Sequence, residues 1–225
     1  MSATSFDYGV YNERMEELAE ASRLLETKRL TASVGGNLSM RVSSEHILVT
    51  PTNIPKGDVA AADICVVDYA GNLLFSRNGR MPTSETPFHT MIMRKRADTA
   101  AVVHAHATAL CAFSIMSENW LEKPFFPEML MEVGPVITVP YAEPSCGILA
   151  DKLEMNILMS NGFLLQNHGA LALSPKSPKD AVLRMEMMES TAQSVFMALS
   201  LGGVNVRPQA ELEAIKKLQE RRGLG

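Results

Sequence analysis

Apolar residues return every three to four positions in several segments of the chain, and this spacing predicts amphipathic helices. The first helix is predicted over Tyr8–Lys28, where Glu and Arg residues separate the apolar positions. The last long one, Ser177–Leu201, is followed by Gly202-Gly203, a pair that should end it. The same spacing predicts further helices over Thr86–Arg96, Ala107–Ser114, Cys146–Met159 (ended by Ser160-Asn161-Gly162) and the charged segment Gln209–Arg222.

Short apolar runs bounded by turn residues predict strands between these helices. Ser43-Ser44-Glu45 should form a hairpin turn, whereas Trp120–Glu132 contains Pro124 and Pro127 and is predicted to be an irregular crossing segment. The predicted strands are Ser39–Val42, Ile47–Thr50, Ile64–Asp68, Leu73–Phe75, Asp98–His106, Val136–Val139, Phe163–Gln166 and Leu171–Leu173. Strands and helices interleave without repeats or a linker, which predicts a single α/β domain over residues 1–225.

The composition argues against several classes of protein. A formal net charge of -4 disfavours a nucleic-acid binder, which normally carries a basic excess. The cysteines Cys65, Cys111 and Cys146 form no CxxC pair, so neither a zinc ribbon nor a disulfide framework is expected. The most apolar window, Ala100–Met116, is short for a membrane span, and Met1–Tyr8 lacks the pattern of a targeting signal. We therefore expect a cytoplasmic protein that binds neither nucleic acid nor membrane.

Two histidines at the end of an apolar run are the first chemical signal. His104 and His106 are two residues apart, so in a strand their side chains share a face and two ring nitrogens can close on one metal ion. The alternative is a pair of buried histidines hydrogen-bonded within the core. A third imidazole, His168, stands in Asn167-His168-Gly169, which reads as a tight turn between two apolar strands. Three nitrogens with an open fourth position are typical of a catalytic zinc site.

Three loops rich in glycine, hydroxyl and amide groups are candidates for binding an anion. They contain Gly35-Gly36-Asn37, Thr52-Asn53 between two prolines, and Thr83-Ser84 at the start of a predicted helix. Each loop has a structural alternative, a tight turn or a helix cap. Glu85 is either a helix cap or a general base beside a metal. His89, one turn later, is interpreted as a residue that packs the helix or supports a ligand, not as a ligand itself.

A metal, a base and a phosphate pocket together predict the making or breaking of a C–C bond next to a carbonyl in a sugar phosphate. The same motifs occur in this order in one known family. They are Gly35–Arg41 (GGNLSMR), Thr50–Pro55 (TPTNIP), Pro82–Glu85 (PTSE), His104–His106 (HAH) and Gln166–Gly169 (QNHG). On these motifs the chain resembles the class II aldolase/adducin family over nearly its whole length. The resemblance implies a three-layer α/β/α fold with a mixed, largely antiparallel central sheet. It also implies a homotetramer with active sites between subunits.

The resemblance also implies a role for each matching residue. His104, His106 and His168 match the ligands of Zn²⁺ or of another divalent first-row metal such as Mn²⁺ or Co²⁺. Glu85 matches the base, which in this family can also bind the metal. The positions that match the substrate-phosphate site are Gly36, Asn37, Thr52, Asn53, Thr83 and Ser84. The implied reaction is reversible cleavage of a ketose 1-phosphate to dihydroxyacetone phosphate and an aldehyde, through an enediolate that the metal stabilises.

The chain departs from the fuculose-phosphate aldolases of this family at three places. Those enzymes carry a tyrosine, donated by a neighbouring subunit, that protonates the aldehyde end; near the matching position this chain has Phe125-Phe126. No tyrosine follows Tyr141, and Asn53 stands where a glycine is usual. Despite these departures, the chain retains the half of the site that binds metal and moves the proton. The departures change the half that would select the aldehyde.

Three alternatives to the aldolase remain. A decarboxylase of a phosphorylated 3-oxo acid, of the 3-oxo-tetronate 4-phosphate type, would form the same enediolate and keep the glutamate and the histidines. A sugar-phosphate 4-epimerase is disfavoured, because those relatives carry an aspartate where Glu85 stands. A non-enzymatic, adducin-like scaffold is also disfavoured, because adducin-type domains lack the metal-binding histidines.

Overall fold

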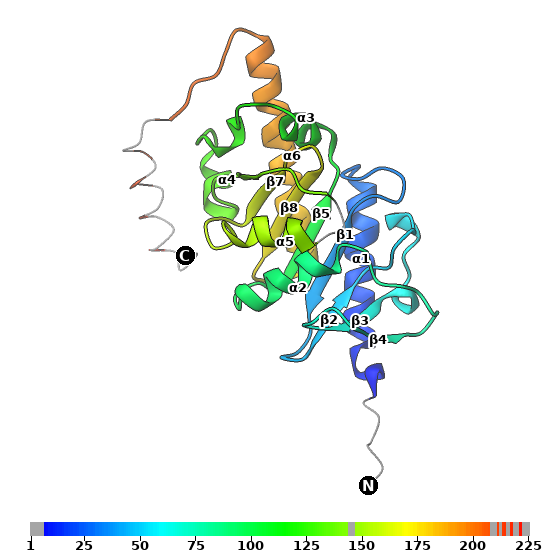
Figure 1. The fold of residues 1–225 in the computed structure, drawn as a ribbon. Coiled ribbons are helices and arrows are strands. Elements are labelled where there is room, and N and C mark those ends of the chain that lie inside the picture. Colours follow the sequence, from blue (N-terminus) through cyan, green and yellow to red (C-terminus); the bar gives the residue numbers. More distant parts are fainter. Residues whose placement is uncertain are drawn as a thin grey trace.

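The computed structural model describes residues 7–143 and 147–207, together with Glu211, Glu213, Ala214, Lys217 and Arg221. Within these residues an eight-stranded sheet has the order β4-β3-β2-β1-β5-β8-β7-β6 (Figure 1). Neighbouring strands are antiparallel except β6 and β7, which are parallel. The strands are β1 (Asn37–Arg41), β2 (His46–Val49), β3 (Cys65–Asp68), β4 (Leu73–Ser76), β5 (Ala101–Ala105), β6 (Ile137–Val139), β7 (Gly162–Leu165) and β8 (Gly169–Ser174). The predicted mixed, largely antiparallel sheet is confirmed.

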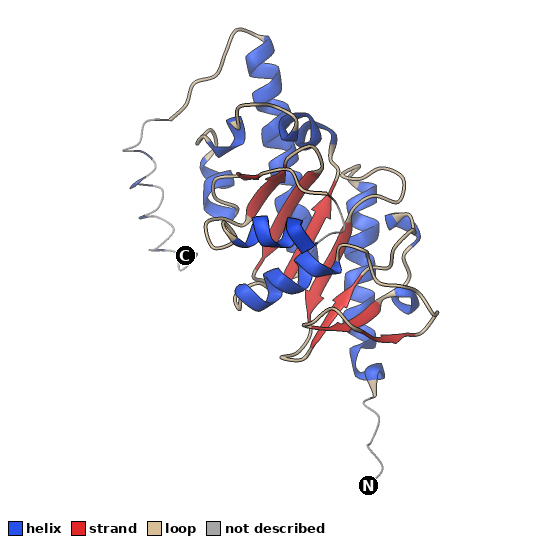
Figure 2. Ribbon diagram, viewed as in Figure 1, coloured by secondary structure: helices blue, strands red, loops and turns tan. Residues whose placement is uncertain are grey.

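Helices cover both faces of the sheet, which gives three layers. The helices are α1 (Asn12–Thr27), α2 (Thr86–Lys95), α3 (Thr108–Ser114), α4 (Pro127–Glu132), α5 (Gly147–Glu154) and α6 (Pro178–Ser200). Figure 2 shows α2 and α5 in front of the sheet, with α1 and α6 behind it. None of the helices in the described part of the chain is both long and apolar enough to cross a membrane.

The alternation of side chains along β5 divides the core into two clusters. Val103 faces α1 and α6, where it packs with residues such as Leu18 and Met185. Val102 faces the opposite layer and packs with residues of α2 and α5, such as Ile92. A fully buried side chain of this size contributes about 1.5–3 kcal/mol to stability. The register of β5 is therefore fixed by two cores, and His104 must lie on the same face as Val102.

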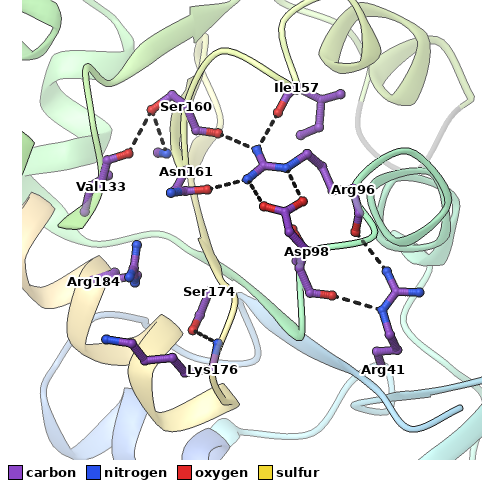
Figure 3. Close-up of polar contacts among 12 residues, drawn as sticks. Arg41, Arg96, Asp98, Val133, Ile157, Ser160, Asn161, Ser174, Lys176 and Arg184 are labelled. Atoms are coloured by element: carbon purple, nitrogen blue, oxygen red, sulfur yellow. Dashed lines mark hydrogen bonds and ion pairs between the residues drawn. The ribbon is translucent and has the colours of Figure 1, made fainter. Parts of the chain in front are cut away.

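Several boundaries differ from the sequence prediction. The helix predicted to reach Met159 ends at Glu154, and Asn161-Gly162 leads into β7 instead of ending a helix. Arg96 holds the intervening turns by donating to the carbonyls of Ile157 and Ser160 (Figure 3). The strand predicted from Asp98 starts only at Ala101, because a backbone hydrogen bond from the Thr99 N–H to the Arg96 carbonyl, at 3.1 Å, closes a turn before it.

Two segments contain elements that the sequence did not predict. The N-terminal helix begins with a 3-10 turn, Tyr8–Tyr11, before α1. The crossing segment predicted to be irregular contains α4, which has Pro127 at its first position, where a missing N–H does no harm. The long helix α6 ends at Ser200, next to Gly202 and Gly203 with φ of 119° and 131°, as predicted. The predicted helix Gln209–Arg222 lies largely outside the described residues.

Candidate active site

Three histidines meet at the end of the sheet where β5 finishes. The ligand atoms of His104, His106 and His168 all lie within 4.8 Å of one another. His104 is in β5, and His106 follows its last residue; their Nε2 atoms are 2.9 Å apart. His168 is in the three-residue turn between β7 and β8, where Asn167 has φ of 56°. Because β5 and β8 are neighbours in the sheet, this turn brings the third imidazole to the first two.

Glycines make the space that these rings occupy. A Cβ atom on Gly35 would lie 2.7 Å from Nδ1 of His106, and one on Gly169 would lie 2.7 Å from Cδ2 of the same ring. Gly36 has φ of 74°, and a Cβ atom there would lie 2.8 Å from the His104 carbonyl oxygen. The Gly35-Gly36 pair therefore lets β1 approach the histidines closely, in addition to lining a pocket.

The protonation of the histidines suits metal binding. Nδ1 of His104 lies 3.0 Å from the carbonyl oxygen of Ala170; a proton donated there leaves Nε2 unprotonated, the state that can bind a metal. Burial, together with neighbouring His106 and His168, lowers the pKa of His104 well below its usual value. Burial is also the main cause of the lowered pKa of His106. The neutral imidazole is the form that binds metals.

Glu85 lies against the same cluster. Its Oε2 atom is 3.3 Å from Nε2 of His104, and its Oε1 atom is 3.4 Å from Nε2 of His168. Glu85 occupies the N-cap position of α2, but its side chain makes no capping hydrogen bond, so the capping alternative is wrong. Thr83 instead accepts a hydrogen bond from the Glu85 backbone N–H, at 3.3 Å. The Oε1 atom is buried and has no hydrogen-bond partner.

A buried chain of hydrogen bonds holds Glu85 in place. The Asn37 side-chain amide donates to Glu85 Oε2 at 2.7 Å, and its oxygen lies 2.5 Å from Nε2 of His89. Nδ1 of His89 lies 2.7 Å from the Ser39 hydroxyl oxygen. Burial lowers the pKa of His89 to about 3, so its ring is neutral. This fits the interpretation of His89 as a supporting residue, although its partners Asn37 and Ser39 could not be identified from the sequence.

A carboxylate from α6 holds the chain that follows His106. Both oxygens of Glu189 accept hydrogen bonds at 3.0 Å, one from the backbone N–H of Ala109 and one from that of Leu110. These N–H groups belong to the first turn of α3, which has no side-chain cap of its own. Glu189 therefore fixes the start of α3 and, through it, the position of His106. Sequence reasoning did not single out this residue.

Every residue expected to bind phosphate lines the pocket beside the histidines. Its volume is about 190 Å³, and Lys56, His106, His168 and Glu85 share its lining with Gly36, Asn37, Thr52, Asn53, Thr83 and Ser84. Asn53 has φ of 57°, a conformation that asparagine tolerates better than most residues, which explains how it can replace a glycine. Lys56 is buried in this lining and was missed in the sequence, where it directly follows the second loop.

Phe125 and Phe126 lie elsewhere. Phe125 lines a hollow with Asn205–Arg207 and Glu211, and Phe126 lines another between α4 and α6. Neither residue belongs to the lining of the histidine pocket. Within one chain, the expected selection of substrate by these phenylalanines therefore stays a prediction.

The donor set fits a divalent first-row cation. Three imidazoles and one carboxylate converge, and two buried atoms at this place, Glu85 Oε1 and His168 Nδ1, have no hydrogen-bond partner. Unpartnered polar atoms in a protein interior are uncommon, and a bound ion would account for the carboxylate oxygen. Nitrogen and oxygen ligands of this kind suit zinc and its first-row neighbours.

Comparison with known proteins agrees with this geometry. The profile of the Class II Aldolase and Adducin N-terminal domain matches residues 16–196. The chain belongs to the class II aldolase/adducin family. Members of this family are typically dependent on a divalent metal, and the three histidines described above provide a matching site.

Relatives with different activities resemble the chain to a similar degree. It is 32% identical to a 3-oxo-tetronate 4-phosphate decarboxylase of Haemophilus influenzae, over 92% of this chain and 96% of the relative. It is 31% identical to an L-fuculose phosphate aldolase of Methanococcus maripaludis, over 83% and 98%. The crystal structure of YgbL from Escherichia coli, described as an aldolase, epimerase or decarboxylase, has 26% identity and a TM-score of 0.83, covering 92% of this chain and 99% of YgbL. The family is therefore shown, while its individual reactions are not separated by these similarities.

Proposed function

We propose that this protein is a metal-dependent lyase that breaks a C–C bond next to a carbonyl in a phosphorylated sugar acid or sugar, with Zn²⁺ as the favoured metal. The observation that carries the proposal is the convergence of three imidazoles and the unpartnered Glu85 Oε1 atom beside a pocket of hydroxyl and amide groups. A divalent cation would act there as a Lewis acid, stabilising negative charge on an oxygen next to the reacting carbon.

Each residue then has a distinct task. His104, His106 and His168 would hold the cation. Glu85 exchanges a proton with the substrate at Oε1, while Asn37 keeps the other carboxylate oxygen in place. The substrate phosphate lies against the polar residues of the three loops, namely Gly36, Asn37, Thr52, Asn53, Thr83 and Ser84. One N–H of the Asn37 amide is committed to Glu85, which leaves the second for the substrate.

Decarboxylation of a phosphorylated 3-oxo acid is the reaction we favour. The bond from the carboxylate carbon to the next carbon breaks, CO₂ leaves, and the electron pair stays on the carbon skeleton, where the 3-oxo group delocalises it. A proton taken from water and passed on by Glu85 completes the product. Two observations support this choice: the similarity to the decarboxylase over 96% of its length, and Phe125-Phe126 in place of a tyrosine that would protonate an aldehyde.

Aldol cleavage of a ketose 1-phosphate, the reaction that the family resemblance implies, is the second candidate. The similarity to the fuculose phosphate aldolase, over 98% of that relative, supports it. The two reactions leave the electron pair on the same kind of carbon and differ in the departing fragment, which is CO₂ or an aldehyde. The residues around the histidines serve both.

We also propose that the protein acts in the cytoplasm as a homotetramer with its active sites between subunits. Large apolar side chains on and after α6 support association: Phe196, Met197 and Leu201 are 60%, 55% and 88% exposed. Light scattering after gel filtration should give four times the mass of the chain. A monomer at micromolar concentration would contradict the tetramer and leave the reaction to be tested separately.

One product screen tests the reaction. Metal-loaded protein is incubated with phosphorylated 3-oxo sugar acids and, separately, with dihydroxyacetone phosphate and a panel of aldehydes. Release of CO₂ without ketose phosphate formation is the expected result. Ketose phosphates without CO₂ release would replace the decarboxylase by the aldolase, and the absence of both products would overturn the proposed function.

A further inference from the structure

Lys56 is a buried cation in the lining of the histidine pocket. It is 1% exposed and begins a 3-10 turn, Lys56–Asp58, after the Thr52-Asn53 loop. Two contacts with α1 fix its backbone region: the Ser22 hydroxyl donates to the Lys56 carbonyl at 2.9 Å, and Glu26 accepts from the next N–H, that of Gly57. A lysine is seldom buried without a partner, because removing an ammonium group from water is costly. Its position therefore calls for an explanation.

The ammonium group has only neutral hydrogen-bond partners. Nζ donates to the carbonyl oxygens of Ile54 at 2.6 Å and of Val34 at 3.2 Å. An ammonium group has three N–H donors, so one donor remains. Among the ion pairs between described residues, none includes Lys56. The charge is thus held in place without a carboxylate in contact with it.

The two carbonyls belong to two of the anion-binding loops. Val34 precedes Gly35-Gly36, and Ile54 follows Thr52-Asn53, and residues of both loops line the pocket together with Lys56. The other polar groups of these loops are neutral hydroxyls and amides. A substrate phosphate carries a charge of about −1.5 to −2 near pH 7. Lys56 is the residue of these loops that can offset part of it.

We propose that Lys56 is the cation of the phosphate subsite and that its free N–H donates to the substrate phosphate. The inference rests on the proposed function only in requiring that the substrate carries a phosphate group. It does not depend on which C–C bond breaks. The alternative role is structural: Nζ would serve only to tie the Val34 and Ile54 loops together. The two roles predict a different dependence of phosphate affinity on pH, and this difference distinguishes them.

The surrounding charges define the pH at which the effect is measured. Burial lowers the pKa of Lys56 to about 8, and the nearby Glu26 carboxylate opposes that shift. His106 also faces Lys56, but its pKa is lowered and it stays neutral in this range. Phosphate affinity should therefore fall as the pH rises through about 8, where the free protein loses the ammonium charge.

The experiment measures inorganic phosphate binding to metal-loaded protein by calorimetry between pH 7 and pH 9. In Lys56→Met, affinity at pH 7 should fall at least tenfold and the decline above pH 8 should disappear. Lys56→Arg keeps the charge, so its affinity should not decline up to pH 9. Lys95→Met is the matched control: it removes one positive charge at the C-terminal end of α2, remote from the pocket, and should behave as the unmodified protein.

Two outcomes would overturn the role of Lys56. The first is unchanged phosphate affinity in Lys56→Met, which would place binding at the metal or elsewhere. The second is weaker binding that keeps the full dependence on pH above 8, which is expected of a structural tie alone. If Lys56→Met does not fold, equal decline of affinity toward pH 9 in Lys56→Arg and in the unmodified protein is the contradicting result.

Turnover separates this inference from the proposed reaction. With an active substrate, Lys56→Met should raise KM at least tenfold and change kcat little, since the residue touches the phosphate and not the reacting carbon. The unmodified protein could release neither CO₂ nor ketose phosphate while Lys56→Met still loses phosphate binding. That result would support the role of Lys56 and refute the proposed reaction. Normal turnover with an unchanged KM would refute Lys56 alone.

Discussion

At the end of the sheet where β5 begins, no buried side-chain nitrogen or oxygen of the described residues lacks a hydrogen-bond partner, whereas at the end where β5 finishes some do. All five N–H groups of Arg96 donate, two of them to Asp98 and three to Ile157, Ser160 and Asn161 (Figure 3). Arg41 donates to the carbonyl oxygens of Met93 and Arg96, tying the end of α2 to β1. These contacts replace the hydration of each guanidinium with protein acceptors.

The end of the sheet where β5 finishes and β8 begins contains polar atoms that still need partners. Glu85 Oε1 and His168 Nδ1 are buried without a hydrogen bond, and Lys56 is buried with no carboxylate of the described residues in an ion pair with it. Such atoms lower stability unless a ligand completes them. The comparison indicates that the first end holds the layers together and that the second is built to bind. The two ends should therefore respond differently to substitution.

The largest effect is expected from removing a histidine. His104→Ala or His168→Ala should abolish binding of the divalent metal and lower turnover by a factor of 10³ or more, on the order of what a catalytic metal supplies. Metal content after dialysis measures this directly. His46→Gln is the control, because His46 begins β2 and its ring contacts Tyr11, away from the pocket. A full complement of metal in both alanine variants would refute the assignment.

Glu85→Gln should keep the metal but reduce turnover by about 10²–10⁴, the usual contribution of a general acid or base. The amide retains the shape of the side chain and the contact with Asn37, but it cannot exchange the proton. Steady-state kinetics and metal analysis on the same sample give both quantities. Activity within a few fold of the unmodified protein would exclude Glu85 as the proton carrier.

Changing the opposite end should affect stability without affecting the metal. Arg96→Met removes all five donors and leaves buried carbonyls unpaired, so the free energy of unfolding should fall by about 2–4 kcal/mol. Chemical denaturation measures the change, and metal titration should give the same affinity as before. A loss of metal affinity beyond tenfold would show that the two ends are coupled, contrary to the comparison.

Asn37→Ala should have a smaller effect at the site. It removes the hydrogen bond to Glu85 Oε2 and separates Glu85 from His89. Residues that orient metal ligands or catalytic groups are typically worth 10–100-fold. We expect kcat to fall by about that factor, with unfolding stability changed by less than about 2 kcal/mol. A kcat equal to that of Glu85→Gln would instead make Asn37 as important as the base it supports.

Acidification should destabilise the metal-free protein through His89. The ring has a pKa of about 3 when folded, below the value near 6.5 of an unfolded chain. Because the unfolded state binds the proton more tightly, stability is highest above pH 6.5 and declines as the pH falls from about 6.5 to about 3. At pH 5 the effect of His89 lowers the free energy of unfolding by roughly 2 kcal/mol relative to neutral pH. His89→Gln should flatten that part of the curve, and an unchanged slope would argue against a neutral buried ring.

The elements whose limits depend on local spacing could be predicted from the sequence. The amphipathic pattern gave α1 and α6, and the two-residue period placed His104 and His106 where they could meet. The turn at Asn167-His168-Gly169 could also be predicted, because asparagine and glycine favour such backbone conformations. These features depend on neighbours in the chain.

What could not be predicted depends on residues far apart in the chain. The end of α5 is set by Arg96, which lies about sixty residues earlier. The role of Glu85 was open between cap and base because its contact with Asn37 spans 48 positions. Nothing in the local sequence distinguishes Lys56 from a surface lysine, since its burial results from packing of its turn on α1.

The most direct test is the metal coordination of the loaded protein, measured by X-ray absorption at the zinc edge. We predict one zinc per chain, with three imidazole nitrogens at about 2.0–2.1 Å and oxygen in the remaining position. In His104→Ala the same measurement should find no specifically bound zinc. Sulfur ligands, zinc surrounded only by water, or an unaltered spectrum in His104→Ala would contradict a metal centre formed by His104, His106 and His168.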